Sequence, residues 1–324
     1  MSATSASPSR RQLHVSQELV LLVALVVALA VLSVTAERFM SVGNLLNQGR
    51  LMTEVALVAL PMTFIIVTAG IDLSVGSMLG LTAIVLGVFW QNLGIPLPAA
   101  IVLALGVGTL AGFFNGLLIT RLRVPPLIMT LATLALYRGL AEGISQARSV
   151  RGYPEWFYVL GQGEVLGVPT QLWILLVAIV AFWVVLSRTT FGRSLYAIGH
   201  NETAARYSAI KVDRIKLIIY SLSGMMSGMA GIIFVSRVST TRSDMGSGLE
   251  LDVIAAVVLG GTSIFGGVGT IAGTVLGFTL IQLLKNGLAL TGVKGDATIV
   301  VIGTVLILSI LITNFLQYRR GSDG

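Results

Sequence analysis

The dominant pattern along the chain is a series of long apolar runs with very few charged positions. A helix needs about 20 apolar residues to cross roughly 30 Å of hydrocarbon, and most of the runs approach or exceed that length. We therefore predict membrane-spanning helices rather than the amphipathic helices of a soluble domain. The runs cover residues 19–36, 55–71, 73–120, 126–141, 165–187, 217–236, 253–284 and 297–318.

Two of these runs are too long for a single helix. The run 73–120 is free of charge but is interrupted at 91–98 by a turn composition, Gln-Asn-Leu-Gly-Ile-Pro-Leu-Pro. The run 253–284 contains a glycine-rich break from 260 to 269, which indicates two helices, one of them short or tucked against the other. The expected fold is therefore an all-α membrane protein of about ten transmembrane helices, with both termini on the same side.

Composition agrees with the pattern and excludes several kinds of chemistry. Hydrophobic residues make up 55% and charged residues 11% of the chain, against roughly 25% charged in soluble proteins. Cysteine is absent and there are two histidines, His14 and His200, so thiolate chemistry is excluded and metal clusters are disfavoured. Neither G-x-x-x-x-G-K-[ST] nor H-E-x-x-H occurs. We predict that the chain is not an enzyme and carries no cofactor.

The net charge of +7 is concentrated in one segment rather than spread along the chain. Residues 188–216 contain six Lys and Arg against two acids. Cytoplasmic loops of membrane proteins carry such an excess, so a nucleic-acid partner is not needed to explain it. We predict a cytoplasmic N-terminal tail (1–18), a single transmembrane domain (19–318) with a cytoplasmic loop at 188–216, and a C-terminal tail (319–324).

Small residues recur at fourfold spacing within several spans. Gly108, Gly112 and Gly116 share one face of the fourth span, and Gly224 and Gly228 share one face of the seventh. Faces of this kind let helix backbones approach closely in a membrane. We expect tight helix packing here; the alternative is that these glycines line a permeation path.

An aspartate interrupts the apolar sequence between the second and third spans. Asp72 lies in the stretch 68–77, Thr-Ala-Gly-Ile-Asp-Leu-Ser-Val-Gly-Ser. An acid between long apolar runs is by default a functional candidate, and Ser74 and Gly76 would lie beside it. Two interpretations remain open: Asp72 caps the third helix, or Asp72, Ser74 and Gly76 form part of a translocation path or gate.

The basic loop contains a short predicted helix. Asn201 is a suitable N-cap for a helix from Glu202 to about residue 210, and Glu202 would lie at its positive end. Ala204 and Ala205 leave one face of this helix nearly smooth. Such a helix is suited to a partner's groove, although a basic loop can also simply contact anionic lipid.

Three stretches of the chain resemble one known family. Residues 192–205, Gly-Arg-Ser-Leu-Tyr-Ala-Ile-Gly-His-Asn-Glu-Thr-Ala-Ala, closely resemble the coupling-loop signature of permease subunits of ribose-type sugar ABC importers. Residues 68–77 and the glycine-rich 251–267 resemble two further motifs of that family, in the same order, and the similarity extends over about 40–316. This chain has Ala69, His200 and Ala209 at positions where the family usually or often has glycine. The resemblance implies that the ATPase-coupling residues are Gly192, Arg193, Ala197, Gly199, Asn201, Glu202, Ala204 and Ala205.

The resemblance further implies a set of partners and a location. Such a permease pairs with a second permease subunit, identical or related, and with two cytoplasmic ATPase subunits that bind the ATP. A periplasmic binding protein delivers the sugar, and the assembly lies in the lipid of the bacterial inner membrane. Related systems import pentoses, rhamnose, galactosides and autoinducer-2. The alternatives are a branched-chain amino-acid ABC importer permease and an ion-coupled secondary transporter, for which Glu54, Asp72, Glu142 and Asp252 would be the ion ligands.

Overall fold

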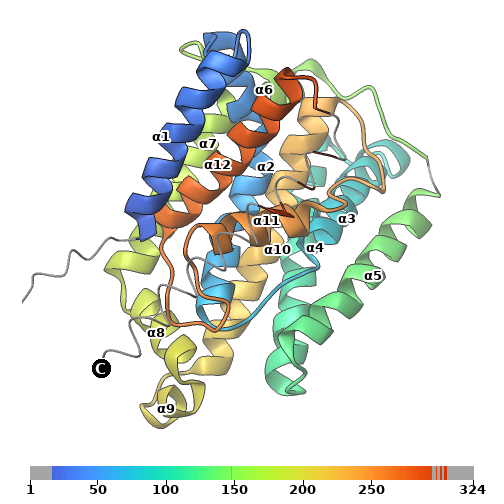
Figure 1. Ribbon diagram of the computed structural model, residues 1–324. Coiled ribbons are helices and arrows are strands. Elements are labelled where there is room, and N and C mark those ends of the chain that lie inside the picture. The colour runs from blue at the N-terminus through green and yellow to red at the C-terminus, as the bar shows by residue number, and fades with distance from the viewer. Residues whose placement is uncertain (1–16, 147, 294–296, 298–299, 301–302, 305–324) are drawn as a thin grey trace, which may run out of the picture.

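The computed structural model describes residues 17–146, 148–293, 297, 300 and 303–304. Within them the chain is mostly helical, as expected, with one two-stranded antiparallel hairpin (Figure 1). The elements are α1 (Gln17–Thr35), α2 (Val42–Val67), α3 (Val75–Gly87), the π-helical turn η1 (Val88–Asn92), α4 (Leu97–Arg121), α5 (Pro126–Ser145), α6 (Glu155–Gln162), β1 (Glu164–Val165), β2 (Val168–Pro169), α7 (Thr170–Arg188), α8 (Thr190–His200), α9 (Glu202–Tyr207), α10 (Val212–Val238), α11 (Leu249–Leu259) and α12 (Ile271–Leu290).

Eight helices in the described part of the chain are long and apolar enough to cross a membrane: α1, α2, α3 with η1, α4, α5, α7, α10 and α12. The expected span at 297–318 and the two tails fall almost wholly outside the described residues. α2 begins at Val42, well before the apolar run at 55, because its polar residues are satisfied by α12. Asn44 hydrogen-bonds Asn286 at 2.9 Å, and Gln48 accepts from Gln282 at 2.8 Å.

The bundle has two ends that differ in structure. One, here called the α9 end, carries α8 and α9 together with the first turns of α1 and α12, where Thr270 donates to Glu18 at 2.7 Å. The other, here called the α6 end, carries α6 and the β1–β2 hairpin, and Arg50 of α2 pairs with Glu164 there. The basic segment 188–216 therefore lies at the α9 end.

The expected pair of helices in 253–284 is present, and the first is short. α11 has 11 residues, about 16 Å of helix and half a membrane crossing. The segment 239–248, without helix or strand, supplies the rest of the crossing. Gly87 lies beside Thr241 and Gly76 beside Gly246, so this segment descends along about 16 Å of α3. A broken crossing at 239–259 thus replaces one continuous span.

α4 and α10 pack backbone to backbone along the glycine faces. A Cβ added at Gly112 would lie 2.1 Å from the carbonyl oxygen of Tyr220, and one at Gly224 would lie 2.1 Å from that of Gly108. Both distances are far below van der Waals contact. The small residues of α4 and α10 therefore serve helix packing, the first of the two interpretations.

We predict opposite effects for two alanine substitutions in α4. Gly112→Ala should destabilise the protein by about 2 kcal/mol or more through overpacking against α10. Gly106→Ala is the matched control, because a Cβ there meets nothing within 4 Å; it should be neutral or gain up to about 1 kcal/mol of helix propensity. Thermal unfolding in detergent measures both, and equal stabilities would contradict the packing role.

Candidate functional site

The chain turns sharply between α7 and α8, and Gly192 in the first turn of α8 packs against the end of α7. The hydroxyl of Thr189 accepts the backbone N–H of Gly192 at 3.2 Å and so caps α8. A Cβ at Gly192 would lie 2.0 Å from the carbonyl oxygen of Leu186, so no other residue fits between α7 and α8 without a shift. Leu195 and Ile198 bury the inner face of α8. Arg193 is exposed, and Ala197 is half-buried.

The end of α8 meets the two other stretches that the sequence analysis singled out. A Cβ at Gly199 would lie 1.9 Å from the carbonyl oxygen of Val67 and 2.3 Å from the nitrogen of Gly267. The N–H of Gly267 itself donates to the carbonyl of Val67 at 2.9 Å, and the hydroxyl of Tyr196 donates to the carbonyl of Gly269 at 2.7 Å. Three segments far apart in the sequence therefore form one junction.

α9 is a single short turn with well-defined caps at both ends. Asn201 accepts the backbone N–H of Ala204 at 2.9 Å, as expected of an N-cap. The helix ends at Tyr207, earlier than expected, because Ala209 adopts a left-handed conformation with φ of 61°. The N–H of Ile210 then bonds the carbonyl of Ala205 at 3.1 Å, which is the Schellman pattern that normally uses glycine at this position.

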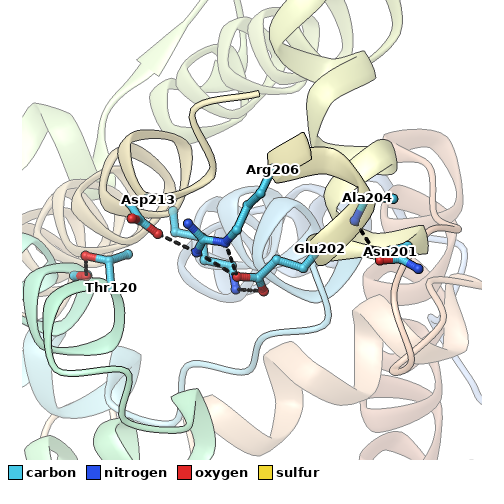
Figure 2. A network of polar contacts seen from close by, with 8 residues as sticks. Thr120, Asn201, Glu202, Ala204, Arg206 and Asp213 are labelled. Atoms are coloured by element: carbon cyan, nitrogen blue, oxygen red, sulfur yellow. Dashed lines mark hydrogen bonds and ion pairs between the residues drawn. The ribbon is translucent and has the colours of Figure 1, made fainter. Parts of the chain in front are cut away.

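Four charged side chains fix α9 to the start of α10 (Figure 2). Glu202 accepts from Arg206 at 2.8 Å and from Lys216 at 2.6 Å, and Arg206 also pairs with Asp213 at 2.5 Å. Partial burial alone would raise the pKa of Glu202, but the hydrogen bonds from Lys216 and Arg206 outweigh it and lower that pKa below its usual value. These ion pairs join α9 to α10, so contacts with α10 stabilise the short helix in addition to its own backbone hydrogen bonds.

The outward face of α9 differs from the expected one. Ala204 is exposed, but Ala205, which the sequence analysis placed on the same face, is buried inside the chain with 4% of its surface exposed. The largest exposed group is Tyr207, with 89% of its surface accessible. The sequence analysis did not single out Tyr207. A tyrosine in a polar loop beside small residues could have indicated a contact residue for a partner.

Asp72 lies in a buried network of hydroxyl groups. One carboxylate oxygen accepts the backbone N–H and the hydroxyl of Ser74, at 3.0 and 2.6 Å, and the other accepts the hydroxyl of Ser223 on α10 at 3.2 Å. Asp72 therefore closes a turn just before α3, with Ser74 as the residue that precedes the helix. No side chain in the described part of the chain accepts a hydrogen bond from the first turn of α3, so Asp72 is not its N-cap, and a place for Asp72 in a translocation path stays a prediction.

The neighbours of Asp72 are equally buried. Ser74 accepts from the amide of Asn115 at 2.8 Å, and Tyr137 donates to Asn115 at 3.2 Å, so α3, α4 and α5 join at this point. A Cβ at Gly76 would lie 2.2 Å from the carbonyl oxygen of Gly246. Gly76 is thus required by the close approach of the broken crossing. Asp72, Ser74 and Gly76 are all buried in this conformation.

The chain matches proteins of one transport family over most of its length. The family model described as "Branched-chain amino acid transport system / permease component" matches residues 41–310. Ribose import permease protein RbsC of Escherichia coli (strain K12) is 41% identical, with 91% of this chain and 93% of the relative covered. RbsC of Bacillus subtilis is 40% identical, with 96% and 98% covered.

A second kind of relative is nearly as similar. The autoinducer 2 import system permease protein LsrD of Yersinia enterocolitica is 38% identical, with 94% of this chain and 97% of the relative covered. No solved structure matches the chain. These matches confirm the resemblance to ribose-type sugar permeases.

We predict that the amide analogue of Asp72 is tolerated. Asp72→Asn keeps an oxygen to accept the N–H of Ser74, so folding and most uptake should persist. Asp72→Leu leaves that N–H and two hydroxyls unpaired, and should cost about 2 kcal/mol or more. Thermal stability in detergent and uptake by cells check both. Loss of uptake in Asp72→Asn at normal membrane levels would place the negative charge in the transport path.

We predict that glycine at position 209 stabilises the end of α9. Ala209→Gly removes about 1 kcal/mol of left-handed strain, so amide hydrogen exchange in α9 should slow about fivefold. Ala204→Gly is the matched control: its site is helical, and it should speed exchange because glycine costs about 1 kcal/mol there. Faster exchange in both variants would contradict the strain.

Proposed function

Since the chain belongs to the branched-chain amino acid transport system / permease component family, we propose that it is the membrane-spanning subunit of an ATP-driven sugar importer. Its relatives include permeases named for ribose and for autoinducer 2, so the proposed substrate is a small sugar or sugar-like solute. The protein is a transport permease and not an enzyme. In the proposed importer, ATP is bound by partner subunits, and a periplasmic binding protein delivers the solute.

The observation that carries this proposal is the structure of α9. It projects at one end of the bundle with Tyr207 and Ala204 facing outward, and the ion pairs of Glu202 and Arg206 hold it rigidly against α10. A rigid, exposed helix with one large aromatic is suited to a partner's groove. We assign this partner to the ATPase, with one ATPase subunit for each of two permeases.

The proposed orientation follows from the same loop. The six basic residues of 188–216 support a cytoplasmic location for the α9 end, on the inner side of the bacterial inner membrane. The α6 end then faces the binding protein. In this arrangement 19–318 is a single membrane domain, and both tails are cytoplasmic.

Two alternatives are less well supported. The family description includes amino-acid permeases, but the relatives given above are named for ribose and autoinducer 2. An ion-coupled transporter needs carboxylates free to bind the ion. Glu54 instead pairs with Arg237 at 2.7 Å, Asp252 pairs with Lys285 at 2.6 Å, and Asp72 accepts from serines.

The test compares a variant of the exposed tyrosine on α9 with a control variant at an equally exposed side chain elsewhere in the protein. Tyr207→Ala should weaken ATPase binding by about 2 kcal/mol, or roughly thirtyfold, as for an interface anchor. Leu166→Ala is the control, because Leu166 is also 89% exposed but lies in the hairpin at the α6 end. Co-purification of the ATPase and sugar-stimulated ATP hydrolysis in vesicles are measured.

Wild-type hydrolysis in Tyr207→Ala would remove the coupling role from α9. Ala204→Trp is a second probe, since it places bulk on the exposed face. Ala205→Trp is not suitable, because Ala205 is buried within the chain and the variant would disturb the permease itself.

A further inference from the structure

A groove of ≈ 430 Å³ lies beside the broken crossing. Its walls come from α2, the end of α10, the segment 239–248 and the first turns of α11. This volume falls within the usual range for small-molecule sites, roughly 300–1,000 Å³. Its polar and aromatic lining residues include Phe234, Thr240, Arg242, Asp244, Ser247 and Asp252.

The groove begins beside the contact of α6 with α10, where Gln162 donates to the carbonyls of Ser236 and Arg237. Val55 lines it and lies halfway along α2, about 20 Å from the Val42 end. The ion pair between Glu54 and Arg237 fixes the end of α10 at the same level. The groove therefore extends from the α6 end of the bundle inward to the level of Val55.

The backbone along the groove cannot face lipid. The segment 239–248 lacks a regular hydrogen-bond ladder, and Arg138 of α5 holds it through the carbonyls of Ser243 and Met245, at 2.5 and 2.9 Å. Irregular backbone at membrane depth is tolerated where it is buried in protein or lines a water-filled cavity. Arg242 and Asp244 on this segment have side chains about 60% exposed, and charged groups at this depth face water or protein.

The charges around the groove are already paired with one another. Arg242 donates to Asp244 at 2.9 Å, and Lys285 donates to Asp252 at 2.6 Å. The groove therefore offers many hydrogen-bonding groups with little net charge. That combination suits a neutral solute with many hydroxyls: carboxylates and hydroxyls bind the OH groups, and Phe234 can pack against the C–H face of the ring.

We propose that this groove is a water-filled sugar-binding station of the permease, entered from the α6 end. The proposal rests on the proposed function for its choice of solute. The water-filled character rests on the geometry of the groove alone.

The absence of cysteine allows a direct test in the complete importer. Ser247→Cys introduces the only thiol of this chain, at an exposed position of the groove. Val177→Cys is the control, because Val177 is 70% exposed in the middle of α7, on an apolar face. Cells are treated with a charged, membrane-impermeant methanethiosulfonate, with and without D-ribose and autoinducer-2, and thiol labelling and uptake are measured.

We expect Ser247→Cys to be labelled, Val177→Cys to remain unlabelled, and labelled Ser247→Cys to lose uptake. A transported solute should slow the labelling. Failure of the reagent to label Ser247→Cys in cells with normal uptake would show that lipid or the second permease covers the groove, and would overturn the proposal. Labelling that leaves uptake intact would also overturn it.

Thr240→Cys, half-buried on the same wall, gives the same readout if Ser247→Cys fails to reach the membrane. Failure of the proposed function has a different signature. Uptake by the unlabelled wild type would then be independent of the ATPase, whatever the labelling of the groove.

Discussion

Three backbone segments meet at the α9 end with no side chain between them, and this contact sets how α8 packs against the membrane helices. Gly199 of α8, Val67 at the end of α2 and Gly267 of the glycine-rich loop approach so closely that a single added Cβ would clash. Because no side chain separates them, α8 cannot shift against α2 or against the loop that leads into α12 without disturbing this contact. In the proposed importer, this contact would link α8 and α9 to the membrane helices.

The charged residues inside the bundle shape the path of the chain. Arg138 donates to two carbonyls of the broken crossing, and Glu54 and Asp252 have cationic partners. Asp72 differs, since its hydrogen bonds come from a backbone N–H and serine hydroxyls. Each group satisfies a backbone turn or joins two helices, which explains why a hydrophobic bundle retains costly polar residues at these points.

Ala69 and Ala209 adopt a backbone conformation that alanine itself disfavours. Both adopt positive φ, at 58° and 61°, where glycine avoids the steric cost of a Cβ. Both positions were recognised from the sequence as departures from the family's glycines. Their backbone conformation follows from the surroundings: Ala69 lies beside Gly266 at the junction, and Ala209 ends α9.

The sequence by itself determined the features that depend on neighbouring residues. Apolar length gave the helices and the all-α class, and a single Asn before a short run gave the cap of α9. Tertiary structure decided whatever depends on distant contacts. α2 extends past its apolar run because Asn44 and Gln48 find partners on α12. Ala205 is buried while Tyr207 is exposed because only one side of α9 packs against the rest of the chain. The irregular course of 239–248 is stable because Arg138, over a hundred residues earlier, binds its carbonyls. A hydropathy pattern cannot predict a contact between residues so far apart in the sequence.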